Sequence, residues 1–373
     1  MSCFESLLRL AGLRHFLHFI AEHIPGIVSR PIALEVSLLG QLPLELILYM
    51  VQFFPPVSRL SFSLCCRPIY FALGTQHLKD ITEEDRHVFL TLLEPKLPDY
   101  ILCYSCKKFH AISNARKHIK LRYLEWAGRR LLPCQNNDIK IYVPYYFHDK
   151  FSFTVFQMTM KLYRQGLDYS KLLNILSAKT TTTPGLGYVV QCLSSAQIIG
   201  GSLFYRRQKI YLMPPNYPVP KFLDHPDFIC RHWSPRPKNP QVEAFRDVIE
   251  NRAWNKIKDL RKLEKLKSCL YCHSEYRYDF AHLGKKGNAV FITQWRNLGE
   301  GRSPMDPQWL KHTHYFSHFN REPVCYTPGS IYAKFESEEH FEFDYNAVST
   351  PQDRKALFSM YYWGLNGESV NYY

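Results

Sequence analysis

The feature that most constrains the fold of this chain is a pair of Cys-x-x-Cys sequences, Cys103 with Cys106 and Cys269 with Cys272. One such turn directs two thiolates at a single ion, and two turns complete the tetrahedral ligand shell of a structural zinc site. Folding can bring distant segments together, and a shared ion would then cross-link them. We therefore predict one structural zinc held by these four cysteines.

Other ligands and other roles for these thiols remain open. The alternative ligands are His110, Cys134, Cys230, His232 and His273. The pairs can also be ordinary reduced thiols, as expected for most of the 11 cysteines of a chain without a secretory signal. A redox pair is a further alternative. A thioredoxin-like site is disfavoured because neither pair opens a helix after a parallel strand.

The first hundred residues have the pattern of short helices. In 42–54, apolar residues recur at the three- and four-residue spacing of one helix face. Pro43 suits a first helical position, and the double proline at 55–56 ends this helix. Two helical pieces are expected in 57–73. A further helix is expected over 82–97, with Thr82 as its N-cap.

Beyond residue 100 the pattern favours strands, because many segments are rich in aromatic and β-branched residues. The segments expected to be extended are 141–147, 151–163, 187–193, 202–213, 289–295 and 330–336. Glycine pairs within this region indicate turns or bulges. One helix, capped by Asn239 and started by Pro240, is expected to run into a basic stretch that ends near residue 267. The sequence thus predicts an α+β fold.

Positive charge is concentrated in the middle of the chain. Residues 101–300 contain 33 Lys and Arg against 14 Asp and Glu, whereas both ends are slightly acidic. This balance favours an acidic partner, which can be a protein, a nucleic acid or a membrane surface. No nucleic-acid-reading motif accompanies the basic helices, so we expect nucleic-acid binding less than a solvated basic surface.

Several classes of function find no support in the sequence. It contains no phosphate-binding glycine-rich loop, no His-Glu-x-x-His and no Gly-x-Ser-x-Gly, and we predict a protein that is not an enzyme. No apolar run reaches the length of a membrane-spanning helix. The N-terminus lacks the features of a signal peptide, so a cytoplasmic or nuclear location is expected.

The segment 39–75 resembles the F-box. The residues that carry the resemblance are Leu42, Pro43, Glu45, Leu46, Ile47, Val57, Leu60, Leu64, Cys65, Arg67 and Leu73. The double proline at 55–56 departs from the motif. The remaining chain resembles fungal F-box proteins of unassigned substrate, in short sequences such as "LPDYILCYSCKKFH" and "TQWRNLGEGRSPMDPQW".

This resemblance implies an organisation and a role. It implies a helical extension over 1–36, an F-box and following helix over 37–98, and a substrate-recognition domain with mixed helices and strands over 99–373. The F-box would bind a Skp-type adaptor, and through it the cullin of an SCF ubiquitin ligase. The expected adaptor-binding residues are Leu42, Pro43, Leu44, Leu46, Ile47, Val51, Leu60 and Leu64. The alternative is a zinc-stabilised nucleic-acid-binding or structural protein in which the F-box likeness is incidental.

Overall fold

A computed structural model gives the structure of the chain, and the chain divides into two compact units, Met1–Pro98 and Asp99–Tyr373. The residues that it describes are 38–65, 69, 73, 81–104, 106–119, 147–148, 151–182, 188–215, 229–230, 232, 243, 246–248, 250, 266–283, 287–313 and 322–336. The expected extension over 1–36 and the candidate ligand Cys134 lie outside these residues. The division into units falls at the domain boundary expected from the sequence.

The described part of the first unit is helical, as expected. It contains α3 (Leu44–Gln52), α4 (Pro56–Ser63), α6 (Glu83–Leu93) and the 3-10 turn η2 (Glu94–Lys96). The double proline separates α3 from α4, with Pro55 as the N-cap of α4. The predicted N-cap Thr82 is confirmed, because its hydroxyl oxygen accepts a hydrogen bond from the backbone N–H of Asp85 at 3.0 Å.

A small apolar core and one arginine hold these helices together. Val51 of α3, Leu60 of α4 and Phe89 of α6 are buried. The guanidinium of Arg59 in α4 donates hydrogen bonds of 2.9 Å to the carbonyls of Phe54 and Gln52. These bonds satisfy carbonyl groups that the end of α3 leaves without helical partners, and they fix α3 against α4.

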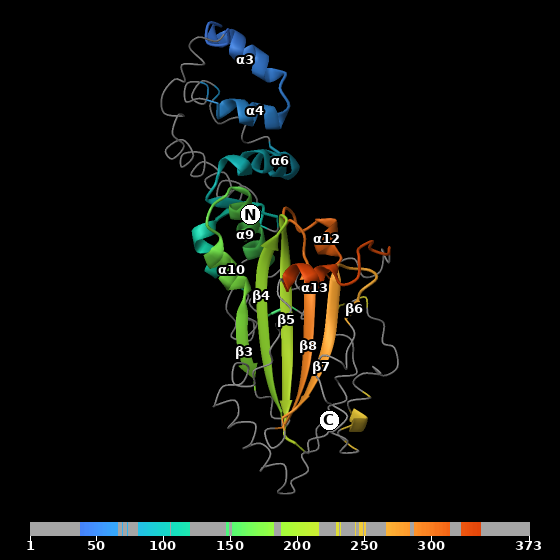
Figure 1. Ribbon diagram of the computed structural model, residues 1–373. Coiled ribbons are helices and arrows are strands. Elements are labelled where there is room, and N and C mark those ends of the chain that lie inside the picture. The colour runs from blue at the N-terminus through green and yellow to red at the C-terminus, as the bar shows by residue number, and fades with distance from the viewer. Residues whose placement is uncertain are drawn as a thin grey trace, which may run out of the picture. The chain divides into compact units, whose positions relative to one another are not determined.

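The second unit is built on a six-stranded antiparallel sheet of order β3-β4-β5-β8-β7-β6 (Figure 1). The strands are β3 (Ala178–Thr182), β4 (Val189–Ile199), β5 (Ser202–Met213), β6 (Lys267–Ser268), β7 (Ser274–His282) and β8 (Asn288–Asn297). The predicted strand 202–213 matches β5, and the predictions at 187–193 and 289–295 fall on β4 and β8. The sequence analysis did not identify β7.

The centre of this sheet consists of the β4–β5 hairpin and the pairing of β5 with β8. Gly200 and Gly201 form the turn between β4 and β5 with φ of 55° and 79°, a left-handed backbone that glycine adopts without strain. The predicted glycine turn is therefore confirmed. β5 then pairs with the distant β8 along ten residues, from Phe204 opposite Asn297 to Met213 opposite Asn288.

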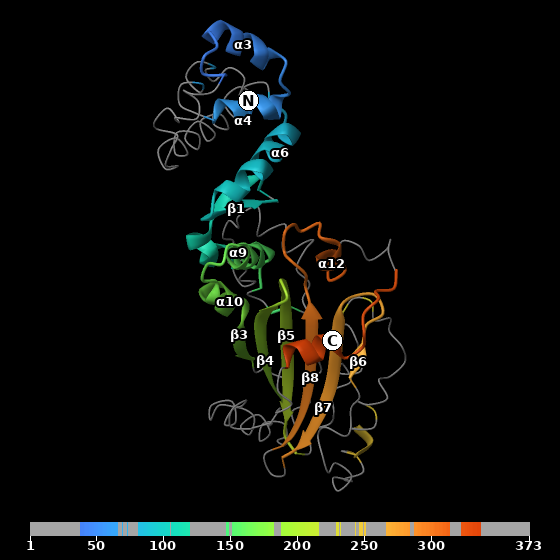
Figure 2. The same cartoon turned by 45° about the horizontal axis from the view of Figure 1, so that its top comes forward.

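A second, two-stranded sheet begins this unit. It consists of β1 (Tyr100–Cys103) and β2 (Lys108–Ala111), and the 3-10 helix η3 (Ile112–His118) follows directly. Helices α9 (Phe153–Arg164) and α10 (Ser170–Leu176) lie at one end of the large sheet (Figure 2). Here a cluster of buried aromatic rings, including Phe151, Phe156 and Trp309, forms the core.

Two predicted strands are in fact helices. The segment 151–163 forms most of α9, and 330–336 forms α13 (Ser330–Phe335), while the short α12 spans Pro307–Leu310. Every residue of α9 from Phe153 to Lys161 is buried, including Gln157 and Lys161, whose side chains donate to carbonyls of β1. Aromatic and β-branched residues indicate burial as much as extended backbone, and tertiary packing decides between the two.

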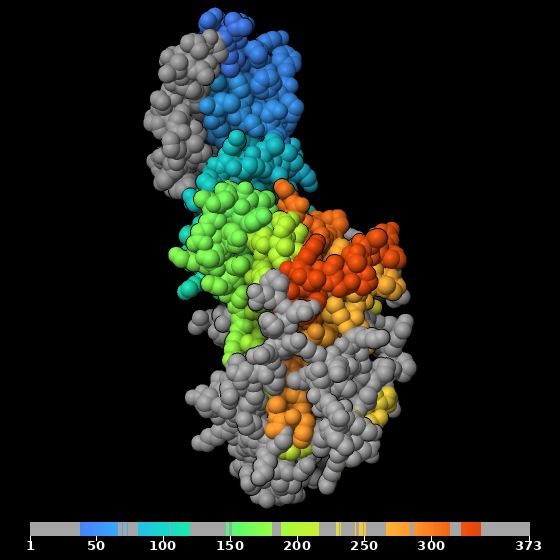
Figure 3. Space-filling model, in the orientation of Figure 1, coloured from blue at the N-terminus to red at the C-terminus, as the bar shows by residue number. Residues whose placement is uncertain are grey.

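Helix α13 packs on one face of the sheet. Its residues Ile331 and Phe335 pack with Phe204 of β5 and Trp295 of β8. Figure 3 shows the segment 322–336 at the surface of this face. The second unit is thus a mixed α+β structure. No helix within the described ranges has both the length and the apolar character required to cross a membrane.

Candidate metal centre

The turn between β6 and β7 carries Cys269 and Cys272. Its backbone is closed by two hydrogen bonds, from the N–H of Cys269 to the carbonyl of Ser274 at 2.9 Å and from the N–H of Ser274 to the carbonyl of Cys272 at 2.7 Å. The N–H of Tyr271 also donates to the Cys269 sulfur at 3.4 Å. This turn holds both thiols on the same side.

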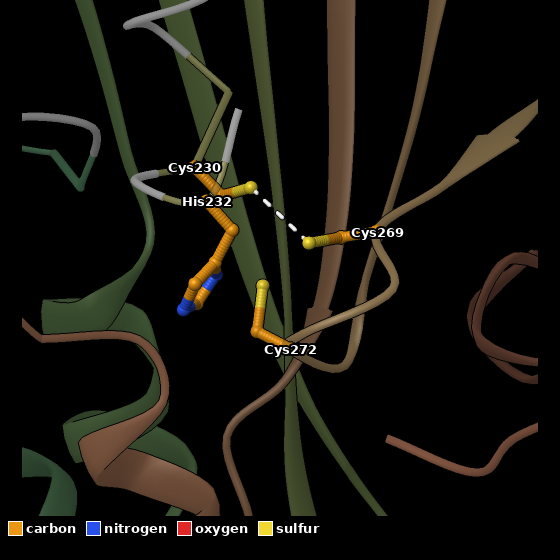
Figure 4. Close-up of side chains that lie close together, drawn as sticks. All are labelled: Cys230, His232, Cys269 and Cys272. Atoms are coloured by element: carbon orange, nitrogen blue, oxygen red, sulfur yellow. Dashed lines mark hydrogen bonds between the residues drawn. The ribbon is translucent and has the colours of Figure 1, made fainter. Parts of the chain in front are cut away.

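Two further side chains complete a four-member group. Cys230 and His232 approach the turn, and the ligand atoms of all four residues lie within 4.8 Å of one another (Figure 4). The sulfurs of Cys230 and Cys269 are 3.5 Å apart, and all three cysteines are free thiols. Zinc–sulfur bonds of about 2.3 Å in a tetrahedron place two sulfurs about 3.8 Å apart. The group is therefore close to the geometry that a metal ion requires.

The segment that carries Cys230 is attached to the centre of the sheet. The guanidinium Nη2 of Arg296 in β8 donates to the carbonyl of Ile229 at 2.5 Å and to Oε1 of Gln294 at 2.6 Å. Arg296 has no exposed surface, and its guanidinium lies 5.2 Å from the centre of the Phe147 ring. This buried arginine fixes the backbone immediately before the Cys230 ligand.

The three cysteines of the group are shielded from solvent, whereas His232 is half-buried. The cysteines at 230, 269 and 272 are 2%, 4% and 0% exposed, and they belong to an apolar cluster with Tyr276 and Tyr278 of β7. Among the described residues, no hydrogen bond reaches the buried Nδ1 of His232. A buried polar atom of this kind needs a partner, and a metal ion at the centre of the group would supply one.

The pKa values of the three thiols are shifted in different directions. Hydrogen bonds from Cys230 and Cys272 hold the pKa of Cys269 well below its ordinary value. The hydrogen bond to Cys269 raises the pKa of Cys230 to about 12, and burial raises the pKa of Cys272. The arrangement thus favours one thiolate stabilised by two thiols. A divalent ion would displace the remaining protons, because metal ligands bind as thiolates.

A second layer of polar groups supports the turn. The thiol of Cys272 donates to the Ser274 hydroxyl at 3.3 Å, and that hydroxyl lies 3.5 Å from Nδ1 of His312. His312 Nε2 lies 3.0 Å from the carbonyl of Asn297, which can only accept, so Nε2 carries the proton. The hydroxyl of Tyr326 lies within 3.0 Å of the carbonyls of Cys269 and Ser274. Such outer contacts orient metal ligands.

The other predicted pair belongs to a different group. Cys103 and Cys106 lie with His110 in the β1–β2 hairpin, and their ligand atoms are within 4.8 Å of one another. The structure therefore does not bring together the set of four cysteines expected from the sequence, and it assigns each pair to its own group. The physical reason is that the hairpin and the six-stranded sheet are separate sheets, so each turn meets different partners.

Cys230 and His232 appeared in the sequence analysis only as alternative ligands. Their Cys-x-His spacing was the signal that could have placed them with Cys269 and Cys272. His273, another alternative, is not a member of the group; its ring lies 5.3 Å from that of Tyr326.

The predicted adaptor-binding residues divide by burial. Pro43, Leu44 and Leu46 are exposed, whereas Leu42, Ile47 and Leu64 are half-buried. Val51 and Leu60 are buried in the small core of the first unit. The last two therefore stabilise the helices, and only the others are accessible to a partner.

No protein-family model matches the chain, and no match is found among curated proteins or among solved structures.

Proposed function

We propose that this protein is a non-catalytic recruitment subunit. Its first unit binds a Skp-type adaptor of an SCF ubiquitin ligase, and its second unit holds a protein target for modification by other subunits. Zinc bound by Cys230, His232, Cys269 and Cys272 stabilises the second unit.

The observation that carries this proposal is an outward apolar face on α3. Leu46, Tyr49, Met50 and Phe53 follow the spacing of a single helix face and are 49%, 59%, 41% and 71% exposed. We refer to these four residues as the outer face of α3. Tyr49 and Phe53 pack edge to face, with ring centroids 5.2 Å apart. Large exposed apolar surfaces mark protein interaction sites.

The opposite side of the same helix explains why this face is available. Val51 of α3 is buried, and the spacing of the helix places it opposite the outer face. The F-box resemblance of the segment 39–75, which contains these residues, supports a Skp-type adaptor as the partner.

The chemistry of the metal centre supports recruitment over catalysis. A catalytic zinc keeps one coordination position for water or substrate, whereas four protein ligands close the shell. The cysteines of this group are buried among tyrosines and aliphatic side chains. The excess of Lys and Arg over residues 101–300 favours a target with an acidic surface.

Co-expression with a Skp-type adaptor tests the proposal. The wild-type chain should co-purify with the adaptor, and Leu46→Asp should abolish co-purification because it places a charge in an apolar interface. Leu167→Asp is the matched control, because Leu167 is an equally exposed leucine of the second unit. Failure of the wild type to retain the adaptor, with salt-sensitive retention of nucleic acid instead, would favour the nucleic-acid-binding alternative.

A further inference from the structure

The β1–β2 hairpin has the backbone of a metal-binding turn. Cys103 ends β1, and the N–H of Cys106 donates to the Cys103 sulfur at 3.4 Å. Lys107 then adopts a φ of 48°, which makes it the one non-glycine residue with positive φ in the described part of the chain. Such a conformation is costly for lysine, and it reverses the chain tightly enough to bring β2 back beside Cys103.

His110 of β2 adds an imidazole to the two thiols. The ligand atoms of Cys103, Cys106 and His110 lie within 4.8 Å of one another. The His110 Nε2 atom is buried, and no hydrogen bond reaches it from the described residues. Two thiols and a buried imidazole nitrogen of this kind supply three of the four ligands of a tetrahedral metal site.

His118, the last residue of η3, lies next to His110 and outside the group of three whose ligand atoms lie within 4.8 Å of one another. Its ring centroid is 4.4 Å from that of His110, with 55° between the ring planes, and the residue is only 3% exposed. Burial and, to a smaller extent, the neighbouring His110 lower the pKa of His118 to about 4, against an opposing effect of Cys106. His118 therefore lies beside both His110 and Cys106. The sequence analysis did not consider it as a ligand.

We propose that Cys103, Cys106, His110 and His118 form a second metal centre, which binds one zinc ion independently of the centre at Cys230. Two thiolates and two imidazoles in a tetrahedron are a ligand set that zinc prefers. Binding releases the two thiol protons to solvent, so the site and its ion together are neutral. No oxidation or reduction is involved.

This ion would fix the beginning of the second unit. The hairpin has four-residue strands, which are too short to be stable alone. It is attached to α9 by two side chains: Lys161 Nζ donates to the carbonyl of Tyr100 at 2.6 Å, and Gln157 Nε2 donates to that of Leu102 at 3.3 Å. A metal ion at the other end of the hairpin would hold the turn and η3 as one rigid element.

Metal content of the full-length protein tests this inference. Protein purified under reducing conditions with added zinc should contain about two zinc ions per chain by mass spectrometry of the element. His118→Ala should lower this value to about one, and Cys269→Ser should also lower it to about one by emptying the other centre. His282→Ala is the matched control, because His282 belongs to neither group, and it should leave two.

Cobalt replacement separates loss of a ligand from loss of the fold. With cobalt in place of zinc, the Cys269→Ser variant should show the visible spectrum of a site with two thiolates and two imidazoles. His118→Cys keeps four ligands; it should retain two ions and shift this spectrum to that of a three-thiolate site. An unchanged metal content and cobalt spectrum in both His118 variants would overturn the inference, as would a wild-type chain that binds a single ion.

Discussion

The guanidinium of Arg296 in β8 donates a hydrogen bond of 2.5 Å to the backbone carbonyl of Ile229, the residue before the candidate metal ligand Cys230. This bond joins the central strand of the sheet to a segment that lies 67 residues earlier in the sequence. The position of one metal ligand thus depends on a side chain that is not itself a ligand.

Arg296→Met should therefore destabilise the protein and weaken metal binding together. The substitution leaves the Ile229 carbonyl without its charged donor, which costs about 2–3 kcal/mol in the free energy of unfolding. Urea denaturation and competition with a zinc chelator measure the two effects. Arg302→Met is the control: Arg302 pairs with Glu300 at the surface, and its loss should change stability by less than about 1 kcal/mol. Equal effects of the two substitutions would refute the anchoring role.

Cys269→Ser should remove the ion of the Cys230 centre and lower the stability of the second unit by several kcal/mol, because the binding free energy of a structural zinc contributes to folding. Thermal unfolding with and without added zinc measures the effect, which should depend on zinc in the wild type. Cys325→Ser is the matched control, since Cys325 is an exposed free thiol. A Cys269→Ser variant that unfolds at the wild-type temperature would argue against a metal at this site.

Acid should destabilise the protein partly through His312. Burial and the charge of Arg296, with smaller contributions from His273 and His232, lower the pKa of His312 to about 3. Between pH 6.5 and about 3, His312 therefore binds a proton in the unfolded chain but not in the folded chain. The contribution of neutral His312 to the free energy of unfolding is fully present above pH 6.5. It is lost as the pH falls below this value, by up to about 1.4 kcal/mol per pH unit.

The comparison of His312→Gln with the wild type isolates this contribution. Unfolding free energies measured from pH 7 to pH 5 should fall less steeply in the variant, because glutamine has no proton to gain. Titration of the metal ligands affects both proteins in the same way and cancels in the difference. Parallel pH profiles would show that His312 is not buried in its neutral form.

Gly287→Ala should be among the most destabilising single substitutions in the sheet. A Cβ atom at Gly287 would lie 2.1 Å from the backbone carbonyl oxygen of Met213, and the φ of 106° is already unfavourable for alanine. We expect a loss of more than about 3 kcal/mol. Gly200→Ala meets nothing within 4 Å and should cost only about 1 kcal/mol for its left-handed backbone. Similar losses for the two variants in chemical denaturation would contradict this packing at the β7–β8 turn.

The sequence predicted those elements whose residues alternate or whose ends carry local signals. β5 was predicted from the pattern of 202–213, and the start of α6 from Thr82, because both signals act within a few residues. Helix α9 was missed because its aromatic and β-branched residues favoured a strand, although Thr154, Gln157, Lys161 and Arg164 recur at helical spacing. The choice was made by packing against residues such as Trp309, which lie far away in sequence.

For the candidate metal ligands, too, the sequence revealed what neighbouring residues determine and not what contacts between distant segments determine. Each Cys-x-x-Cys turn was recognised because two ligands lie within one turn of chain. The grouping was not, since it depends on which distant segment the fold brings to each turn. Cys230 reaches its position through Arg296, and His118 reaches His110 through the path of η3. Residue spacing reveals neither of these two contacts, although the Cys-x-His spacing of Cys230 and His232 marks both as candidate ligands.

Binding of a purified Skp-type adaptor, measured by isothermal titration calorimetry, tests the recruitment function most directly. The wild-type chain should bind with one-to-one stoichiometry. Tyr49→Asp and Phe53→Asp should each weaken binding by at least about tenfold, because burial of one large apolar side chain contributes about 1.5–3 kcal/mol. Leu167→Asp should bind as the wild type does. Absence of heat from the wild type, or wild-type affinity in the two α3 variants, would contradict recruitment through the outer face of α3.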